Sequence, residues 1–415
     1  MKRLIRNIKQ IIQIDESNRP YVAGKEMATL NTLDQAWLLI EDELIKDYGK
    51  MSELPQMQVD ETIDATASIV LPAFCDPHTH LVFPETREIE YIDKIKGLTY
   101  EEIAQRGGGI LNSAKKIVEK SEDELYTTAM ERLHEIASYG TAAVEIKSGY
   151  GLTTEGELKM LRVIKRLKEN SPLSIKANFL GAHAIPPEYK NNQSDYVDLI
   201  INEMLPAVAS EGLADYIDVF CDRGFFTVKE TDRILEAGAK YGLRPKIHAN
   251  ELDYSGGIQV GVKHQALSVD HLEYTGDEEI EALQNSGTMP TLLPGASFFL
   301  GLIFAPARKM IEAGLPIAMA SDFNPGSSPS GNMQFILSLG SIKYRLLPEE
   351  GIHATTINAA YAMGLEKETG TITKGKKANL IITKEIPNYE FLPYYYGANK
   401  VKQTIIKGKT VIIND

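Results

Sequence analysis

Eight short apolar runs of β-strand character, separated by helical segments, restrict the possible folds of this chain more than any other feature. Segment 153–170 has Thr153 before an acidic first turn, and segment 227–242 ends at a glycine, as helices commonly do. Eight buried strands with intervening helices predict an α/β fold, a (β/α)8 TIM-like barrel. The runs are SIVLPAF (68–74), TAAVEI (141–146), SIKANFL (174–180), YIDVFC (216–221), RPKIHA (244–249), ALSVDH (266–271), TMPTLL (288–293) and PIAMAS (316–321).

The two ends of the chain have a different pattern. Residues 1–67 contain β-type runs such as RNIKQIIQI and QAWLLIEDELI, and residues 370–415 contain GTITKGKKANLIITK and KQTIIKGKTVIIND. Both ends are rich in turns and lack long helical periods, which indicates strands. We therefore expect a small β-sandwich domain built from residues 1–67 and 370–415, with the barrel inserted between them as residues 68–369.

The composition excludes several classes of function. The net charge is −13 and no run of lysines and arginines stands out, which argues against a nucleic-acid partner. Cys75 and Cys221 are the only cysteines and lie far apart, as in proteins of a reducing compartment. The N-terminal stretch lacks the continuous apolar core of a signal peptide, and the longest apolar stretch, 298–307, is too short to span a bilayer. We expect a cytoplasmic protein that acts on a small molecule.

Most of the histidines fall where a barrel would gather its functional residues. The chain has eight histidines, and five of them lie at predicted C-terminal strand ends, where such barrels place their sites. His78 and His80 follow the first run, and strand alternation puts both side chains on one face. The other three of the five are His183, His248 and His271. The remaining histidines, His134, His264 and His353, lie in helical segments, and we interpret them as structural.

Imidazoles and carboxylates at one end of a barrel indicate a metal site. Three neutral imidazoles and one carboxylate, such as Asp322 after the eighth run, suit Zn²⁺ or iron and leave a position for water. A bound cation lowers the pKa of that water to about 7, and Glu251 could move the proton. From the residues alone, His183 and His271 could instead orient other groups, and Arg87 could be a solvated arginine.

These motifs resemble those of the amidohydrolase superfamily, which has His-x-His after strand one, histidines after strands five and six, and an aspartate after strand eight. The resemblance covers residues 76 to about 329 and extends near the C-terminus through GTITKGKKANLII. The stretches that carry it are DPHTHLVF followed by TRE, then KSGYGL, GAHAIPPEY, KIHANE, DHLEY, LLPGASFFL and SDFNPGSSP.

The resemblance implies a site and an activity. It implies hydrolysis of the cyclic amide of 4-imidazolone-5-propanoate to N-formimidoyl-L-glutamate, in L-histidine degradation, by an enzyme that we expect to be a homodimer. It implies catalytic roles for Glu251 and His271, with His271 stabilising an oxyanion. It implies one Zn²⁺ or Fe³⁺ per chain on His78, His80, His248 and Asp322. The implied substrate contacts are Arg87, Tyr150, His183, Glu251, Asn324, Gly326 and Ser327.

Some alternatives stay open at this stage. The family usually has a Gly-Gly pair where Pro84 and Glu85 stand here, and Glu85 could pair with Arg87 and occupy it. The NPGSSPSG loop is expected to open a helix whose N-terminus favours an anion. The chain could also be another cyclic amidohydrolase, an aminohydrolase that releases ammonia, or a barrel that only binds a ligand. A binuclear relative would need a lysine after the fourth run, where none occurs, so we expect a single metal.

Overall fold

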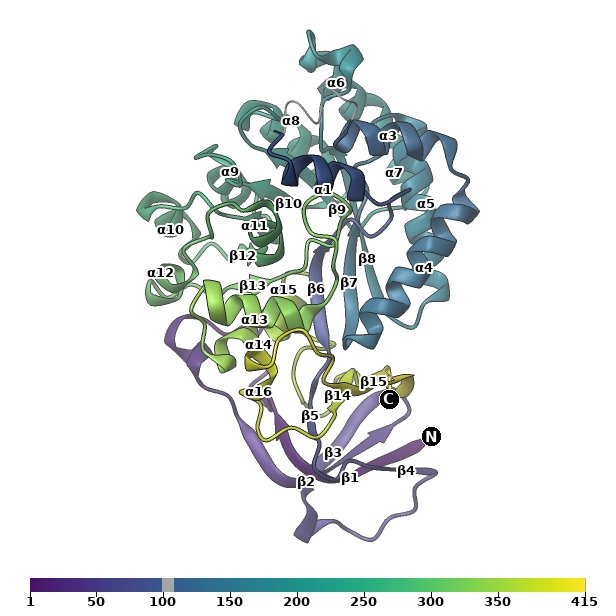
Figure 1. Ribbon diagram of the computed structural model, residues 1–415, viewed down its shortest axis with the longest axis vertical. Helices are drawn as coiled ribbons and strands as arrows, with labels where there is room; N and C mark the ends of the chain where they lie inside the picture. The colour runs from purple at the N-terminus through teal and green to yellow at the C-terminus, as the bar shows by residue number, and fades with distance from the viewer. Residues whose placement is uncertain (99–107, 415) are drawn as a thin grey trace.

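The protein, described by a computed structural model over residues 1–98 and 108–414, has a parallel barrel above a sheet made from both chain ends (Figure 1). Within the described residues, the barrel sheet has the order β13-β12-β11-β10-β9-β8-β7-β6, and all neighbouring pairs are parallel. The predicted barrel is therefore confirmed. Its strands are β6 Phe74–Thr79, β7 Thr141–Lys147, β8 Ser174–Ala182, β9 Tyr216–Cys221, β10 Arg244–Ala249, β11 Ser268–His271, β12 Met289–Leu292 and β13 Ala318–Met319.

The barrel is nearly closed at the end that carries the histidines. Thr79 forms a parallel bridge with Phe323, beyond the short strand β13. The backbone N–H of His80 donates to the carbonyl of Phe323 at 2.9 Å, and the N–H of Asp322 donates to the carbonyl of His78 at 3.0 Å. These bonds hold the segment after β13 directly beside the end of β6, so residues about 240 positions apart become neighbours.

The chain termini form one mixed sheet, as predicted for a separate β domain. Its order is β16-β15-β14-β5-β1-β2-β3, with β4 paired to β1. Its core is a separate cluster of mainly Ile, Leu, Val and Ala side chains. The division at residues 67/68 and 369/370 stays a prediction. The strands are β1 Lys2–Ile12, β2 Thr32–Glu41, β3 Leu44–Lys50, β4 Glu61–Asp64, β5 Ile69–Pro72, β14 Leu380–Thr383, β15 Val401–Ile406 and β16 Lys409–Ile413.

The first predicted barrel strand, 68–74, is wrong in its placement. Its residues 69–72 form β5, which pairs with β1 and β14 of the terminal sheet. The chain changes sheets within one residue, because the N–H of Ala73 donates to Asn379 while the N–H of Phe74 donates to Gly140. Both strands are buried, and the apolar run of β5 continues through Ala73 into Phe74 and Cys75 of β6, so hydrophobicity does not mark the break between them.

Helices cover the outside of the barrel, the predicted N-terminus at Thr153 is confirmed, and the second predicted helical segment also begins with a capping threonine. The side chain of Thr153 accepts from the N–H of Gly156, and Thr227 forms a reciprocal capping box with Glu230. The helices are α1 Glu88–Ile95, α3 Ile110–Glu119, α4 Glu122–Ser138, α5 Thr154–Asn170, α6 Gln193–Leu199, α7 Leu205–Ser210, α8 Val228–Ala239, α9 Gly257–Lys263, α10 Asp277–Leu283, α11 Pro294–Leu300, α12 Ala307–Glu312, α13 Met333–Lys343, α14 Pro348–Thr355, α15 Ile357–Tyr361 and α16 Phe391–Tyr394. The shorter helical segments are η1 Gly24–Ala28, η2 Met51–Glu53, η3 Pro187–Tyr189 and η4 Ile200–Met204.

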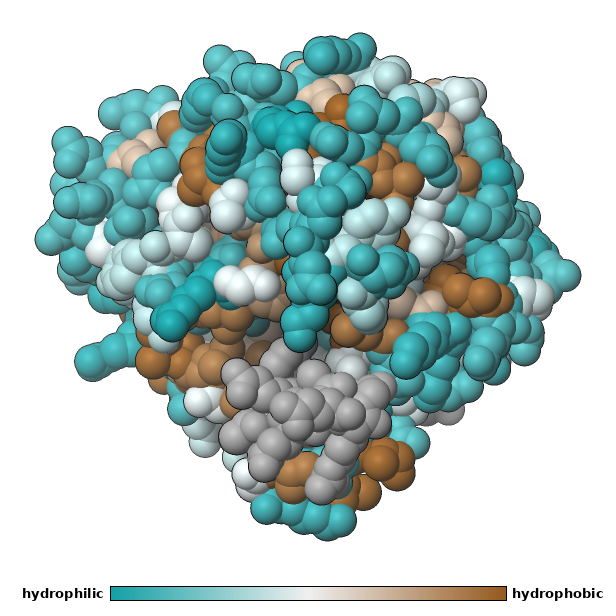
Figure 2. Space-filling model, turned by 90° about the horizontal axis from the view of Figure 1, so that it is seen from above, coloured by the Kyte–Doolittle hydropathy of each residue, from teal (hydrophilic) through white to brown (hydrophobic). Residues whose placement is uncertain are grey.

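The surface seen from above the barrel is mainly hydrophilic. Hydrophobic residues lie there in several separate patches between hydrophilic ones (Figure 2). Among the described residues, no helix combines the length and the apolar character needed to cross a membrane.

Candidate active site

A cavity of about 480 Å³ opens at the C-terminal ends of the barrel strands. Its lining comes from the C-terminal ends of all eight strands or from the segments that follow them, which is where this fold builds its sites. Of the site residues predicted from the sequence, His78 alone does not line it, because that side chain is fully buried beneath the others. The predicted residues that line the cavity are His80, Arg87, Tyr150, His183, His248, Glu251, His271, Asp322, Asn324, Gly326 and Ser327.

Four predicted metal ligands converge at the floor of this cavity. Nε2 of His78 lies 3.5 Å from Oδ1 of Asp322, and Nε2 of His80 lies 3.7 Å from the same oxygen. Nε2 of His248 lies 3.4 Å from Nε2 of His80. Two ligands of a tetrahedral zinc ion, each at about 2.1 Å, are about 3.4 Å apart. The spacing of these donors therefore fits a metal ion.

The electrostatics of the histidines also fit a metal. Burial lowers the pKa of His78 and His80 well below the ordinary value, and neighbouring cationic or imidazole groups add to the shift. Both rings are therefore neutral, which is the form that binds a metal. Nε2 of His78 is buried and has no hydrogen-bond partner among the described residues. A buried nitrogen without a partner is costly, and a cation would satisfy it.

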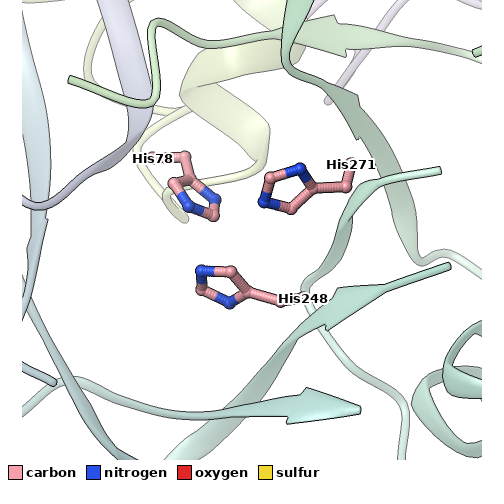
Figure 3. A group of neighbouring side chains, drawn as sticks. All are labelled: His78, His248 and His271. Atoms are coloured by element: carbon pink, nitrogen blue, oxygen red, sulfur yellow. The ribbon is translucent and has the colours of Figure 1, made fainter. Parts of the chain in front are cut away.

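Further nitrogen donors lie within reach of the same point. Figure 3 shows His78, His248 and His271, from β6, β10 and β11, with their rings directed toward one another. Their donor atoms lie within 4.8 Å of one another, as do those of His80, His183 and His248. In His183, Nδ1–H donates to the carbonyl of Gly149 at 2.9 Å, which leaves Nε2 as an acceptor. The choice of His78, His80, His248 and Asp322 as ligands stays a prediction.

Two buried aspartates orient the candidate ligands, and sequence reasoning missed this role for both. Nδ1 of His78 donates to Asp270 at 2.7 Å, and Nδ1 of His248 donates to Asp218 at 3.0 Å. Binding a histidine through Nδ1 fixes its tautomer and directs Nε2 to the opposite side. Both carboxylates thus aim the free nitrogens at the cavity floor.

A buried lysine joins these two aspartates. Nζ of Lys147, on β7, lies 2.7 Å from Asp218, 2.6 Å from Glu145 and 3.6 Å from Asp270. Burial alone would raise the pKa of Asp218, but Lys147 and His248 hold it well below the ordinary value. Lys246 also bonds to Glu145. The only sequence signal was a charged residue at alternate positions inside otherwise apolar strands, such as Glu145 and Lys147 in β7.

The side chain of Arg87 lines the cavity, and Glu85 does not form an ion pair with it. The carboxylate of Glu85 pairs instead with Lys116 at 2.6 Å. Nε and Nη2 of Arg87 donate to the hydroxyl of Ser113 at 3.1 and 2.7 Å, a contact that the sequence did not predict. The guanidinium also lies 5.5 Å from the ring centre of Tyr150. Ser113 therefore fixes one edge of Arg87, and the effect of the Pro84–Glu85 departure on this loop stays a prediction.

The loop after β13 supports Asp322 and ends just before a helix. Its amides at Gly326 and Ser327 both donate to Oδ1 of Asn324 at 2.8 Å, and the hydroxyl of Ser327 donates to Asp322 at 3.1 Å. The next helix, α13, begins only at Met333. The loop therefore leads into a helix as expected, but Asn324 uses its amides at Gly326 and Ser327, and the side chain of Asn332 caps the first turn of α13, so an anion at this helix N-terminus stays a prediction.

Glu251 lies on the cavity wall in a loop held by another carboxylate. The N–H groups of Glu251 and Leu252 donate to Asp222 at 2.7 and 2.9 Å. Burial raises the pKa of Glu251 well above the ordinary value, and the carboxylates of Glu273, Asp322 and Asp222 raise it further. A carboxyl group with a raised pKa can both take and return a proton near neutral pH.

The three remaining histidines lie outside the site, as interpreted from the sequence. His134 is exposed on α4. His264 pairs with Asp232 at 2.7 Å, and His353 contacts Gln13 and the carbonyl of Thr29, each at 2.9 Å.

Comparison with known proteins shows the family of this chain. The model of the amidohydrolase family matches residues 69–411. The chain is 56% identical over 411 residues to the imidazolonepropionase of Christiangramia forsetii, covering 99% of this chain and 100% of that protein. The imidazolonepropionase of Geobacillus kaustophilus is 42% identical over 416 residues, covering 99% and 98%.

Solved structures support the same fold. An atrazine chlorohydrolase from Arthrobacter aurescens complexed with zinc superposes with a TM-score of 0.76 at 17% identity, covering 99% of this chain and 95% of that one. A triazine hydrolase variant gives a TM-score of 0.77, also at 17% identity, covering 100% and 95%. The family match, the full-length relatives and the shared fold lead to one conclusion: the chain belongs to the amidohydrolase family and, within it, groups with the imidazolonepropionases.

Proposed function

We propose that the chain hydrolyses the cyclic amide of 4-imidazolone-5-propanoate to N-formimidoyl-L-glutamate, a step of L-histidine degradation. The observation that carries this proposal is the composition of one cavity. A set of metal-type donors lies at its floor, a buried glutamate lies on its wall, and a guanidinium lies in it for an anionic substrate. The names of the full-length relatives support the same reaction.

One Zn²⁺ or Fe³⁺ per chain would be held by His78, His80, His248 and Asp322. A metal in this position would polarise a carbonyl oxygen and make hydroxide available at neutral pH. The donor spacing of 3.4–3.7 Å and the unpartnered Nε2 of His78 support this assignment. Asp218 and Asp270 keep two of these histidines in the tautomer that presents Nε2.

Glu251 and His271 would carry out the proton transfer and the charge stabilisation. Glu251 accepts a proton from the attacking water and delivers it to the ring nitrogen as the ring carbon–nitrogen bond breaks. The new carbon–oxygen bond forms at the ring carbonyl carbon, so the product gains one water. His271 donates to the carbonyl oxygen, on which negative charge develops. Both side chains line the same cavity.

Arg87, Tyr150 and His183 would bind the substrate. The guanidinium of Arg87 suits the propanoate carboxylate, because it can bind both oxygens. Tyr150 and His183 lie with their ring centres 5.5 Å apart, beside His80, and would contact the imidazolone ring. Asn324, Gly326 and Ser327 would border the bound ring, while Asn324 and Ser327 also hold Asp322 in place.

The test is an assay with freshly prepared imidazolonepropanoate, whose ultraviolet absorbance falls on hydrolysis. We expect metal-loaded protein to consume the substrate and to form one N-formimidoyl-L-glutamate per turnover without ammonia. Ammonia release would favour the aminohydrolase alternative, and binding without turnover would favour a ligand-binding barrel. A homodimeric state and a cytoplasmic location remain part of the proposal. Sedimentation velocity would measure the oligomeric state.

A further inference from the structure

The outer rim of the cavity is formed in part by α1 and by the C-terminal end of α11. Tyr91 and Lys94 of α1 and Phe299 and Leu300 of α11 all line the cavity. The rings of Tyr91 and Phe299 are stacked, with their centres 5.1 Å apart and their planes inclined by 23°. None of the residues of α1 is buried, whereas the candidate metal ligands are. The helix α1 therefore lies at the mouth of the cavity, and the candidate ligands lie at its floor.

Lys94 places a positive charge at this mouth. Its Nζ donates to the carbonyls of Leu300 at 3.0 Å and Phe299 at 3.4 Å, at the end of α11, where carbonyls have no partner within the helix. Burial lowers the pKa of Lys94, and no carboxylate among the described residues opposes this shift. Other partly buried cations, such as Arg308 and Lys377, form an ion pair with a glutamate. The charge of Lys94 is therefore not neutralised within the described part of the chain.

Glu90 is the carboxylate with which Lys94 would be expected to pair, but it has other partners. It precedes Lys94 by four residues, a spacing at which opposite charges on a helix often pair. Its Oε2 instead accepts from the N–H of Gly109 at 3.0 Å, and its Oε1 accepts from Nδ2 of Asn112 at 3.3 Å. The helix α1 is therefore bonded to the start of α3 through Glu90 and to the end of α11 through Lys94.

Arg87 and Lys94 form a short row of charges along one side of α1. Arg87 directly precedes the first residue of this helix, and Lys94 follows seven residues later. Seven residues are about two turns, so the two side chains start on the same side of the helix, about 10 Å apart along its axis. They are the only lysine and arginine among the described residues that line the cavity. A substrate that enters past α1 therefore meets the ammonium group first and the guanidinium second.

An anionic substrate requires a positive charge at such an entrance. The chain has a net charge of −13, so its overall field repels an anion. The carboxylates of Glu90, Glu251 and Asp322 also line the cavity. A cation at the mouth of a cleft raises the local concentration of an anionic ligand and its rate of association.

We propose that Lys94 is a specificity-determining residue whose ammonium group attracts the substrate's carboxylate at the mouth of the cavity before Arg87 binds it. The identity of the substrate rests on the proposed function, whereas the preference for a carboxylate does not. A lysine suits the entrance because it is a hydrated point charge on a flexible stem, and an arginine suits the final contact because it binds both carboxylate oxygens. A charge at the rim of a binding site changes mainly the association rate and its salt dependence. Loss of this charge should therefore lower kcat/KM and leave kcat unchanged.

The first experiment measures kcat/KM for imidazolonepropanoate in zinc-loaded protein at about 0.01 M and about 1 M salt, where the screening length is about 30 Å and about 3 Å. Lys94→Gln removes the charge but keeps an N–H donor for the carbonyls of α11. We expect this variant to lose about 10-fold in kcat/KM at low salt, the lower end of the effect of such attraction on association rates. Most of this loss should disappear at high salt, and Lys94→Arg should retain the wild-type value.

The second experiment does not require turnover. Imidazolepropanoate carries the propanoate but has no ring carbonyl to hydrolyse, and propylimidazole also lacks the carboxylate. We expect calorimetry on zinc-loaded protein to show that Lys94→Gln weakens the binding of imidazolepropanoate at low salt. The binding of propylimidazole should be the same in the variant and in the wild type.

Two control variants separate the position of the charge from its other effects. Lys159→Met removes a lysine that also donates to three carbonyls at the end of a helix, here α3, at 3.0–3.3 Å, but that does not line the cavity. Lys96→Met removes a positive charge from the exposed C-terminal end of α1, two residues from Lys94. Both variants should have a kcat/KM close to that of the wild type at either salt concentration.

Three results would refute the proposal. A loss of kcat/KM in Lys94→Gln that is equally large at high salt would show that Lys94 acts by packing α1 against α11. Equal weakening of imidazolepropanoate and propylimidazole would exclude recognition of the carboxylate. An equal loss in Lys96→Met would show that the total charge of α1 matters and the position of Lys94 does not. Failure of the proposed function would look different, because a protein that does not hydrolyse imidazolonepropanoate would still bind imidazolepropanoate with the help of Lys94.

Discussion

Replacing Gly326 by alanine should displace the guanidinium of Arg87 and so weaken its contact with the substrate, although Arg87 itself is unchanged. A Cβ atom on Gly326 would lie 2.3 Å from Nη1 and 3.3 Å from Cζ of Arg87, whereas ordinary contacts begin at 3.4 Å. Gly326 does not have a positive φ, so alanine adds no backbone strain. The added methyl group therefore acts mainly by pushing the guanidinium away.

The size of the effect follows from the displacement. Restoring an ordinary contact requires Nη1 to move by about 1 Å, which would also stretch the bonds of 3.1 and 2.7 Å to Ser113. A misplacement of this size costs about 10²-fold in rate. Complete loss of the carboxylate contact in Arg87→Met should cost more, about 2–5 kcal/mol, part of it from leaving the substrate charge unpaired. We expect Gly326→Ala to lie between the wild type and Arg87→Met.

The assay compares kcat/KM for imidazolonepropanoate with that for an analogue lacking the carboxylate. Gly326→Ala should weaken the first strongly and the second little, with an unchanged melting temperature. The decisive control is the double variant with Arg87→Met, in which the methyl group has no guanidinium to displace. If Gly326→Ala lowers kcat/KM as much in that background as in the wild type, the reasoning is refuted.

Other variants test the remaining assignments. His78→Ala and His248→Ala should each lose stoichiometric metal, measured by mass spectrometry of the purified protein; full metal content would exclude them as ligands. Glu251→Gln should bind metal normally and lose about 10²–10⁴-fold in kcat, and unchanged turnover would reject its catalytic role. Asp270→Asn should weaken metal binding by about 10–100-fold in a chelator competition, because Asp270 orients His78. Glu85→Ala should leave kcat/KM unchanged, since Glu85 pairs with Lys116; a change would revive its link to Arg87.

The barrel strands could be predicted where turn residues lie on both sides of a buried apolar run. The runs at 216–221 and 244–249 match β9 and β10 in full. The run at 68–74 failed because an apolar stretch looks the same whether it crosses one sheet or two. Only the partners of Ala73 and Phe74, which lie more than 60 residues away in the chain, divide it.

The predicted site residues share a property that the sequence displays. They follow strands, and the C-terminal ends of parallel strands in a barrel converge, so position along the chain translates into proximity. The contacts of Arg87 could not be predicted in this way. Its neighbour Glu85 looked like its partner, yet α3 supplies Ser113 to Arg87 and Lys116 to Glu85. The packing of α3 decides which of its residues contacts Arg87 and which contacts Glu85. No local sequence pattern predicts these contacts.

The buried charges beneath the site show the same limit more strongly. Glu145, Lys147, Asp218 and Lys246 lie inside strands, where a charge is costly unless it is paired. Each of these side chains has a partner on another strand. The cost of burying the charges is therefore offset only after the barrel closes. Lys147 then holds the carboxylate that aims His248 and lies 3.6 Å from the one that aims His78. The same closure that buries these charges therefore also orients the imidazoles, and the fold and the candidate metal site cannot be stabilised independently.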